Sequence, residues 1–337
     1  SVRRVTQDQR RPQTDVDRIA EAHLDREVAL SPITATYLGL PGHDGELDDL
    51  SPEGFAAHSR LRRETLAALD RAATVDDVDR VTVEAMRERL GLAEEFHDAG
   101  LDLAELNVIA SPLQEVRDIF DLMPTDTDEQ VATIGRRMAA MPKALDQWFE
   151  SLAEGVSRGD VAARRQVEAC IKQTEDHTAD DGYFTTYAAQ HPAIADQIAT
   201  AAKAYADAGR RLREEVLPHA PEQDGCGRDR YPLFSREFLG AAIDLEETYA
   251  WGQEELARIT AEMQRVAEQI KPGASVAVVG LGPAAQPHAR SLLDLSDRAE
   301  VVWAASRTRE RAEAFAGDFP FPVTTDIDAA IAELQIG

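Results

Sequence analysis

The sequence is poor in cysteine and has no long apolar run. Its two cysteines, Cys170 and Cys226, are too few for a disulfide framework and too few for a structural zinc site. No apolar run approaches the roughly 18 residues that a membrane-spanning helix needs. The N-terminal arginines are not followed by the apolar segment of a signal peptide. From these absences we expect no membrane association and a cytoplasmic location.

Basic residues are also scarce relative to acidic ones. The 337 residues include 36 Lys and Arg against 62 Asp and Glu, which gives a formal net charge of −26. A chain with this charge offers no basic face to neutralise the phosphates of DNA or RNA, or an anionic membrane surface. The composition therefore excludes nucleic acid as an expected partner. Because 43% of the residues are hydrophobic, the chain can still bury a sizeable core.

Runs of β-branched residues are rare before residue 270, and the apolar residues there recur at helical spacing. In one such segment Ser51 is expected to cap a helix that has Pro52 at its first position. A later helix is expected to run to Gly155, with a kink or break at Pro142. These patterns predict an all-α domain over residues 1–274.

Near Pro272 and Gly273 the pattern changes to short β-rich runs that alternate with helical stretches. The expected strands are "SVAVVG", "EVVWAAS" and "FPVTT". Strands that alternate with helices indicate a parallel sheet. We therefore expect a mainly α protein, in which the all-α domain is followed by a partial α/β Rossmann (βαβαβ) unit over residues 275–337.

The first of these strands leads into a glycine turn that is typical of dinucleotide-binding proteins. Gly280, Gly282 and Ala285 form the pattern G-x-G-x-x-A at the start of a helix. The first glycine permits a tight turn, the second lets the backbone approach a pyrophosphate, and the third small residue lets the helix pack against the strand. The N-terminus of the helix offers N–H donors to the anion. The predicted cofactor-binding residues of the turn are Gly280, Leu281, Gly282, Pro283, Ala284 and Ala285.

The end of the second expected strand favours NADP over NAD. Ser306 and Arg307 stand where an NAD site usually has an acidic residue, and Arg311 follows one helical turn later. An acidic residue repels the 2′-phosphate of NADP, whereas Ser and Arg can bind it. The alternative is that the glycines only shape a turn and that Arg307 is a solvated surface residue.

Residues 276–334 resemble the N-terminal half of the Rossmann domain of the Gfo/Idh/MocA oxidoreductases. The resemblance includes His288 after the glycine turn, Ser306-Arg307, and "AEAFA" at 312–316. An ornithine-cyclodeaminase-like segment is the second choice. The first resemblance implies hydride transfer with a nicotinamide cofactor, but the family's catalytic Lys motif lies beyond the matched part. It therefore assigns no catalytic residue, and we expect catalysis to be incomplete in this chain.

A second resemblance covers the helical part. The segments 31–58 and 227–275, with landmarks such as Tyr231, Asp244 and Trp251, resemble the bacterial family called domain of unknown function 885. This resemblance implies a helical, zinc-peptidase-like protein with a metal motif that contains His-Glu. The dipeptide His-Glu does not occur here, so we expect no metal ligands and no bound zinc, and we expect the family's pattern to end near residue 275. The alternative function is a non-catalytic relic of that family in which the Rossmann piece is only structural.

Three further expectations concern single features. "GVSRG" around Ser157 spells a nucleophile elbow, but it follows a helical run, so we expect the C-terminus of a helix. We expect core packing for one set of aromatic residues: Tyr231, Phe234, Phe238, Tyr249 and Trp251. The half-complete sheet would leave an apolar edge and face exposed, from which we expect oligomerisation, poor solubility or docking on the helices.

Overall fold

The computed structural model describes residues 11–269 and 274–334 of the chain. The chain forms two compact units, Ser1–Ile243 and Asp244–Gly337. The domain boundary that the sequence predicts near Pro272 and Gly273 lies outside the described residues.

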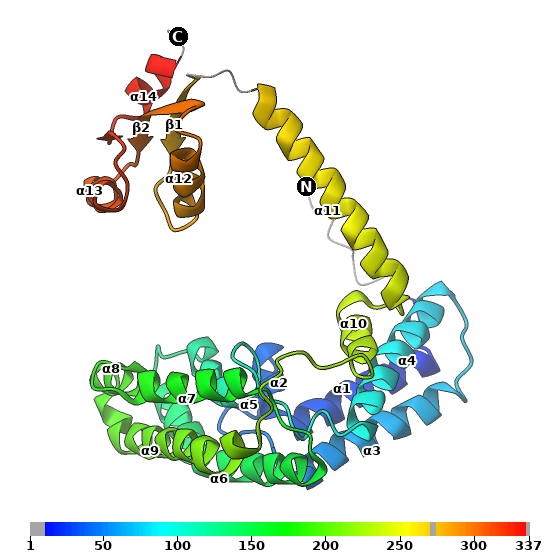
Figure 1. Cartoon of the computed structure of the whole chain (residues 1–337). Coiled ribbons are helices and arrows are strands. Elements are labelled where there is room, and N and C mark those ends of the chain that lie inside the picture. The colour runs from blue at the N-terminus through cyan, green and yellow to red at the C-terminus, as the bar shows by residue number, and fades with distance from the viewer. Residues whose placement is uncertain (1–10, 270–273, 335–337) are drawn as a thin grey trace. The chain divides into compact units, whose positions relative to one another are not determined.

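The N-terminal unit is helical (Figure 1). Its α-helices are α1 (Asp15–Leu30), α2 (Pro32–Tyr37), α3 (Pro52–Leu69), α4 (Asp77–Asp98), α5 (Pro112–Asp118), α6 (Asp128–Arg158), α7 (Arg164–Thr178), α8 (Tyr183–Gln190), α9 (Ala195–Arg211) and α10 (Tyr231–Leu239). A π-helical turn, Leu212–Val216, continues α9.

Local signals at the helix ends account for several of these boundaries. The Ser51 hydroxyl accepts a hydrogen bond from the Gly54 N–H at 3.2 Å, and Pro52 occupies the first turn of α3, as predicted. Helix α6 continues through Pro142 to Arg158, so the break expected at Pro142 does not occur. Buried side chains on both sides of Pro142 hold this helix in the core, and their packing outweighs the one backbone hydrogen bond that proline removes.

The end of α6 confirms the interpretation of "GVSRG". Ser157 lies in the last helical turn, where its hydroxyl donates to the Glu154 carbonyl at 2.7 Å. Gly159 follows with φ of +79°, the left-handed conformation that ends many helices. A nucleophile elbow would need a strand before the serine, and here a helix precedes it.

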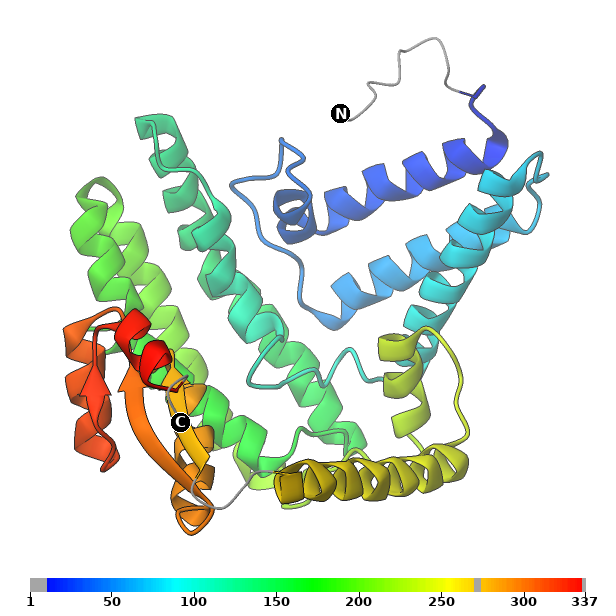
Figure 2. The same cartoon turned by 90° about the horizontal axis from the view of Figure 1, so that it is seen from above.

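The main core lies between α5, α6, α7, α8 and α9. Trp148 and Phe149 of α6, Val167 of α7, Phe184 of α8 and Tyr205 of α9 are all buried there. The apolar residues of each helix recur at helical spacing, so each helix turns one apolar face toward the others. Helices α1, α3 and α4 enclose a smaller cluster of their own, and both views show α1 and α3 side by side (Figure 2).

Two charged side chains, those of Asp79 and Arg137, are fully buried in the N-terminal unit. The Arg137 guanidinium of α6 donates to the backbone carbonyls of Glu46 at 2.6 Å, Pro32 at 3.0 Å and His43 at 3.3 Å. It also donates to the Thr36 hydroxyl at 2.9 Å. All these acceptors are neutral, so Arg137 fixes the segment from α2 into the following loop by hydrogen bonds to uncharged groups.

The C-terminal unit begins with the long helix α11 (Leu245–Gln269) and continues as a small α/β unit. The latter consists of β1 (Ala274–Val279), α12 (Ala285–Asp294), β2 (Ala299–Ala305), α13 (Arg309–Asp318), β3 (Val323–Thr324) and α14 (Ile327–Leu334). The strands are parallel and lie in the order β1-β2-β3. Helices α12 and α13 lie on one face of the sheet and α14 on the other (Figures 1 and 2). The structure thus confirms a mainly α chain with a partial parallel α/β unit.

The core packing expected for the aromatic set is wrong. Phe238 of α10 is 93% exposed, and Tyr249 and Trp251 of α11 are 69% and 61% exposed. Of the set, only Phe234 stacks on another ring among the described residues, edge to face with Phe96 at 5.2 Å between ring centroids. Helical spacing shows that apolar side chains share a face, but it does not show which element covers that face.

Candidate functional site

The glycine turn after β1 has the backbone that the sequence predicts. Gly280 has φ of +93°, a conformation that glycine adopts without strain. Its N–H donates to the carbonyl of Ala305 at 2.9 Å, which holds the turn beside the end of β2. A Cβ atom at Gly282 would meet no atom within 4 Å, so the turn is open at this position. Leu281 and Ala285 are buried and pack in the small core under the sheet.

The turn presents backbone donors at the N-terminus of α12. Within the described part of the chain, the N–H groups of Leu281, Gly282 and Ala284 have no hydrogen-bond partner. The next two N–H groups bond within the turn, from Ala285 to the Gly282 carbonyl at 2.9 Å and from Gln286 to the Pro283 carbonyl at 3.3 Å. Free N–H groups at the positive end of a helix dipole are the donors that an anion uses.

The residues predicted to distinguish NADP from NAD stand at the end of β2. Ser306 is buried, and its hydroxyl accepts a hydrogen bond from the Thr308 N–H at 3.4 Å. Arg307 and Arg311 are exposed, and neither side chain has an ion pair or hydrogen bond among residues 11–269 and 274–334. By contrast, Arg309 pairs with Glu313 at 3.0 Å. Because β1 and β2 are parallel neighbours, these arginines lie at the same edge of the sheet as the glycine turn.

The N-terminal unit contains a cavity of about 700 Å³ that sequence reasoning did not find. Its walls come from the end of α4 and the loop after it, from the α6–α7 connection and the start of α7, and from α10 and the segment that leads into it. They include Phe96, Leu101, Asp102, Glu105, Leu106, Gln166, Asp224, Cys226, Arg230, Phe234 and Glu237. This volume lies within the usual range of small-molecule sites.

Glu105 is the most perturbed carboxyl group of this cavity. Burial against the cavity walls, together with the negative charges of Glu115, Glu237 and Asp102, raises the pKa of Glu105 from 4.5 to about 7. Its side chain lines the cavity and keeps accessible surface there. No hydrogen bond or ion pair reaches Glu105 within the described residues. A carboxyl group that changes charge near neutral pH is able to act as an acid or base, or to bind a cation in its ionised form.

The raised pKa of Glu105 predicts a pH-dependent gain in stability for Glu105→Gln. Between about pH 4.5 and pH 7 the folded chain holds a proton on Glu105 that the unfolded chain has lost, so wild-type stability falls across this window. The variant has no carboxyl group at this position, so it should be more stable than wild type at pH 8, and the difference in stability should shrink toward pH 4.5. Urea unfolding at pH 4.5, 6 and 8 measures this difference in the free energy of unfolding. The exposed Glu150→Gln is the control, and equal pH profiles for all three proteins would contradict the assignment.

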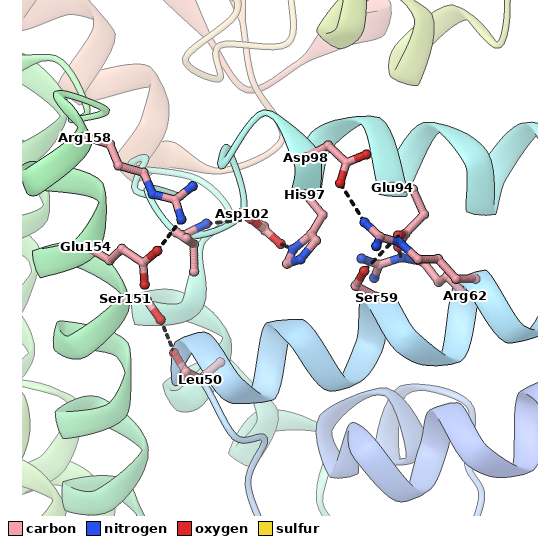
Figure 3. Close-up of polar contacts among 12 residues, drawn as sticks. Leu50, Ser59, Arg62, Glu94, His97, Asp98, Asp102, Ser151, Glu154 and Arg158 are labelled. Carbon is pink, nitrogen blue, oxygen red and sulfur yellow. Dashed lines mark hydrogen bonds and ion pairs between the residues drawn. The ribbon is translucent and has the colours of Figure 1, made fainter.

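Next to the cavity, polar side chains join α3 to α4 (Figure 3). Glu94 accepts hydrogen bonds from Ser59 at 2.8 Å, Arg62 at 2.5 Å and Arg63 at 2.6 Å. His97 Nδ1 lies 2.6 Å from a carboxylate oxygen of Asp102, so one wall residue of the cavity is held by a histidine. The Glu94 carboxylate is saturated by its donors, so we interpret this group as structural support.

No group of three or more His, Cys, Asp or Glu side chains within the described ranges is arranged to hold a metal ion. Among the same residues, no helix has the length and apolar character needed to cross a membrane.

Comparison with known proteins shows the family and the fold. No curated protein sequence matches. The chain resembles a solved structure, "The crystal structure of the putative lipoprotein from Colwellia psychrerythraea", with a TM-score of 0.62 and 16% sequence identity. The similarity covers 90% of this chain and 57% of that protein, so the present chain spans little more than half of the length of that protein.

A family profile, "Bacterial protein of unknown function (DUF885)", matches residues 32–335. The match continues through the α/β unit, so the expectation that the family's pattern ends near residue 275 is wrong. Neither the family nor the similar lipoprotein is described as an oxidoreductase or a peptidase. The chain belongs to the bacterial family of unknown function DUF885.

Proposed function

We propose that the C-terminal α/β unit binds a dinucleotide, and that it binds NADP in preference to NAD. The observation that carries the proposal is the set of free N–H groups on Leu281, Gly282 and Ala284, which surround an open glycine turn at the start of α12. A pyrophosphate placed there would accept hydrogen bonds that the protein leaves unmade. The resemblance of residues 276–334 to the first half of the Gfo/Idh/MocA Rossmann domain points to the same ligand class.

The preference for NADP rests on Arg307 and Arg311. Both guanidinium groups are exposed beside the turn and lack a carboxylate partner in the described part of the chain, so binding a 2′-phosphate breaks no existing ion pair. Ser306 contributes less than the sequence predicts, because its hydroxyl is buried and already accepts a hydrogen bond from Thr308. The proposal assigns binding only, and no residue of this chain is assigned to hydride transfer.

A second candidate function is that the chain is a non-catalytic relic of its family. In this case the glycines only shape a turn, and the α/β unit has a purely structural role. Helix α12 has two of its first N–H groups bonded within the turn, and Pro287 supplies none. This leaves the helix with fewer donors than an unhindered N-terminus, and it favours a purely structural turn.

Substitution of Arg307 separates the two candidates. We expect Arg307→Ala to weaken the binding of NADPH by about tenfold, because a charge-assisted hydrogen bond contributes about 1.5 kcal/mol or more, and to leave the binding of NADH unchanged. Fluorescence titration of the full chain with each cofactor measures both affinities. Arg309→Ala is the matched control, because Arg309 lies on the same segment but pairs with Glu313. If neither cofactor binds the wild-type chain, the structural candidate is the correct one.

A further inference from the structure

We propose that the cavity of the N-terminal unit binds an organic ammonium ion with an apolar body, such as an arylalkylamine, and that Glu105 and Glu237 face the ammonium group. The first support is the shape of the site. The cavity has a volume of about 700 Å³, large enough for a small organic molecule, and segments far apart in the sequence form its walls.

The charges of the cavity do not balance. Its one arginine, Arg230, is already bound by Asp160. Asp224 is likewise neutralised, because its carboxylate accepts a hydrogen bond from Arg165 at 2.6 Å. Asp102 is held by His97 and by the backbone N–H of Leu103 at 2.9 Å.

The carboxylates of Glu105 and Glu237 remain. Neither side chain has an ion pair or a hydrogen bond within residues 11–269 and 274–334. Both side chains line the cavity and are exposed to solvent, so a bound cation would meet two carboxylates that have no cation partner among the described residues. The cavity is therefore complementary to a positive charge.

The walls of the cavity favour an organic cation over a metal ion. Phe96 of α4 and Phe234 of α10 meet edge to face at 5.2 Å, and Leu101 and Leu106 add apolar surface. Aromatic rings attract ammonium groups and pack against a hydrocarbon body. A metal ion would need three or more suitable ligands together, and the described side chains offer no such group. An ammonium ion with an attached ring uses both the carboxylates and the apolar wall.

Proton linkage gives the site a distinctive signature. Burial and the charges of Glu115, Glu237 and Asp102 raise the pKa of Glu105 to about 7. Arg230 and Asp224 also line the cavity, and each is already paired with a residue of opposite charge. An ammonium ligand prefers the ionised carboxylate, so it should bind about tenfold more tightly at pH 8 than at pH 6.

The test is a calorimetric titration of the full chain with phenethylamine at pH 6 and pH 8. We expect binding by wild type that weakens about tenfold at pH 6, and a loss of about tenfold with disappearance of the pH dependence in Glu105→Gln. Glu237→Gln should also weaken binding. Glu150→Gln, an exposed carboxylate of α6 outside the cavity, should behave as wild type.

Phenethyl alcohol distinguishes charge recognition from simple apolar binding, because it has the same ring without the ammonium group. Circular dichroism confirms that each variant is folded. The proposal is overturned if the alcohol binds as tightly as the amine, if Glu105→Gln binds the amine like wild type, or if millimolar amine gives no binding heat. Because the cavity and the glycine turn use different residues, none of these outcomes changes the test of dinucleotide binding.

Discussion

Replacing Arg137 with methionine should lower the free energy of unfolding by about 3 kcal/mol or more. The guanidinium is fully buried and donates to three backbone carbonyls, those of Pro32, His43 and Glu46. Methionine fills much of the volume but donates no hydrogen bond, so these acceptors lose their partner. The segment from α2 into the following loop would then lose these hydrogen bonds to α6.

Urea unfolding followed by circular dichroism measures the effect, and the neighbouring Arg136→Met is the control. Arg136 is exposed and pairs with Glu129 at 3.3 Å, a surface contact that contributes under about 1 kcal/mol. Equal losses in the two variants would show that Arg137 contributes no more than a surface arginine, and the assigned hydrogen bonds would be wrong.

The second large effect is expected for Gly209→Ala, at the crossing of α7 and α9. A Cβ atom on Gly209 would lie 2.0 Å from the hydroxyl oxygen and 3.0 Å from the Cβ of Thr174. Thr174 is buried and its hydroxyl donates to the Ile171 carbonyl at 2.7 Å, so moving it away breaks that hydrogen bond. The two helices must separate or distort, and we expect a loss of about 2 kcal/mol.

Gly91→Ala is the matched control for this substitution. Gly91 also lies inside a helix, α4, but a Cβ atom there would meet nothing within 4 Å. Alanine is the better helix former by about 0.8–1.0 kcal/mol, so this variant should be more stable than wild type. The two variants are expected to change the free energy of unfolding in opposite directions. The higher helix propensity of alanine, which both variants share, therefore cannot account for the difference. A stabilised Gly209→Ala chain would show that α7 and α9 do not approach closely at Thr174.

Some features of the fold could be predicted because they depend on neighbours in the sequence. Ser51 and Pro52 mark the start of α3 by capping chemistry alone, and the β-rich runs after residue 274 identify the parallel strands. The left-handed backbone of Gly280 follows from the glycine pattern in the same way. Each of these local features is determined by a few consecutive residues, and contacts with distant parts of the chain change it little.

Features that depend on distant segments could not be predicted. The aromatic character of Tyr249 and Trp251 indicated core packing but could not show that both side chains would be exposed. Helical spacing places Arg137 on the apolar face of α6, but it does not show which carbonyl groups of a distant segment its guanidinium would meet. Glu105 stands between apolar residues in a loop, and only the folded chain brings it beside Glu237 of α10.

The measurement that tests the proposed function most directly is a calorimetric titration of the full chain with NADPH and, separately, with NADH. The free N–H groups of Leu281, Gly282 and Ala284, with Arg307 and Arg311 beside them, predict that both cofactors bind and that NADPH binds more tightly. Tighter binding of NADH would contradict the role given to the two arginines. Binding of neither would show that the glycine turn is structural and would contradict the proposed function.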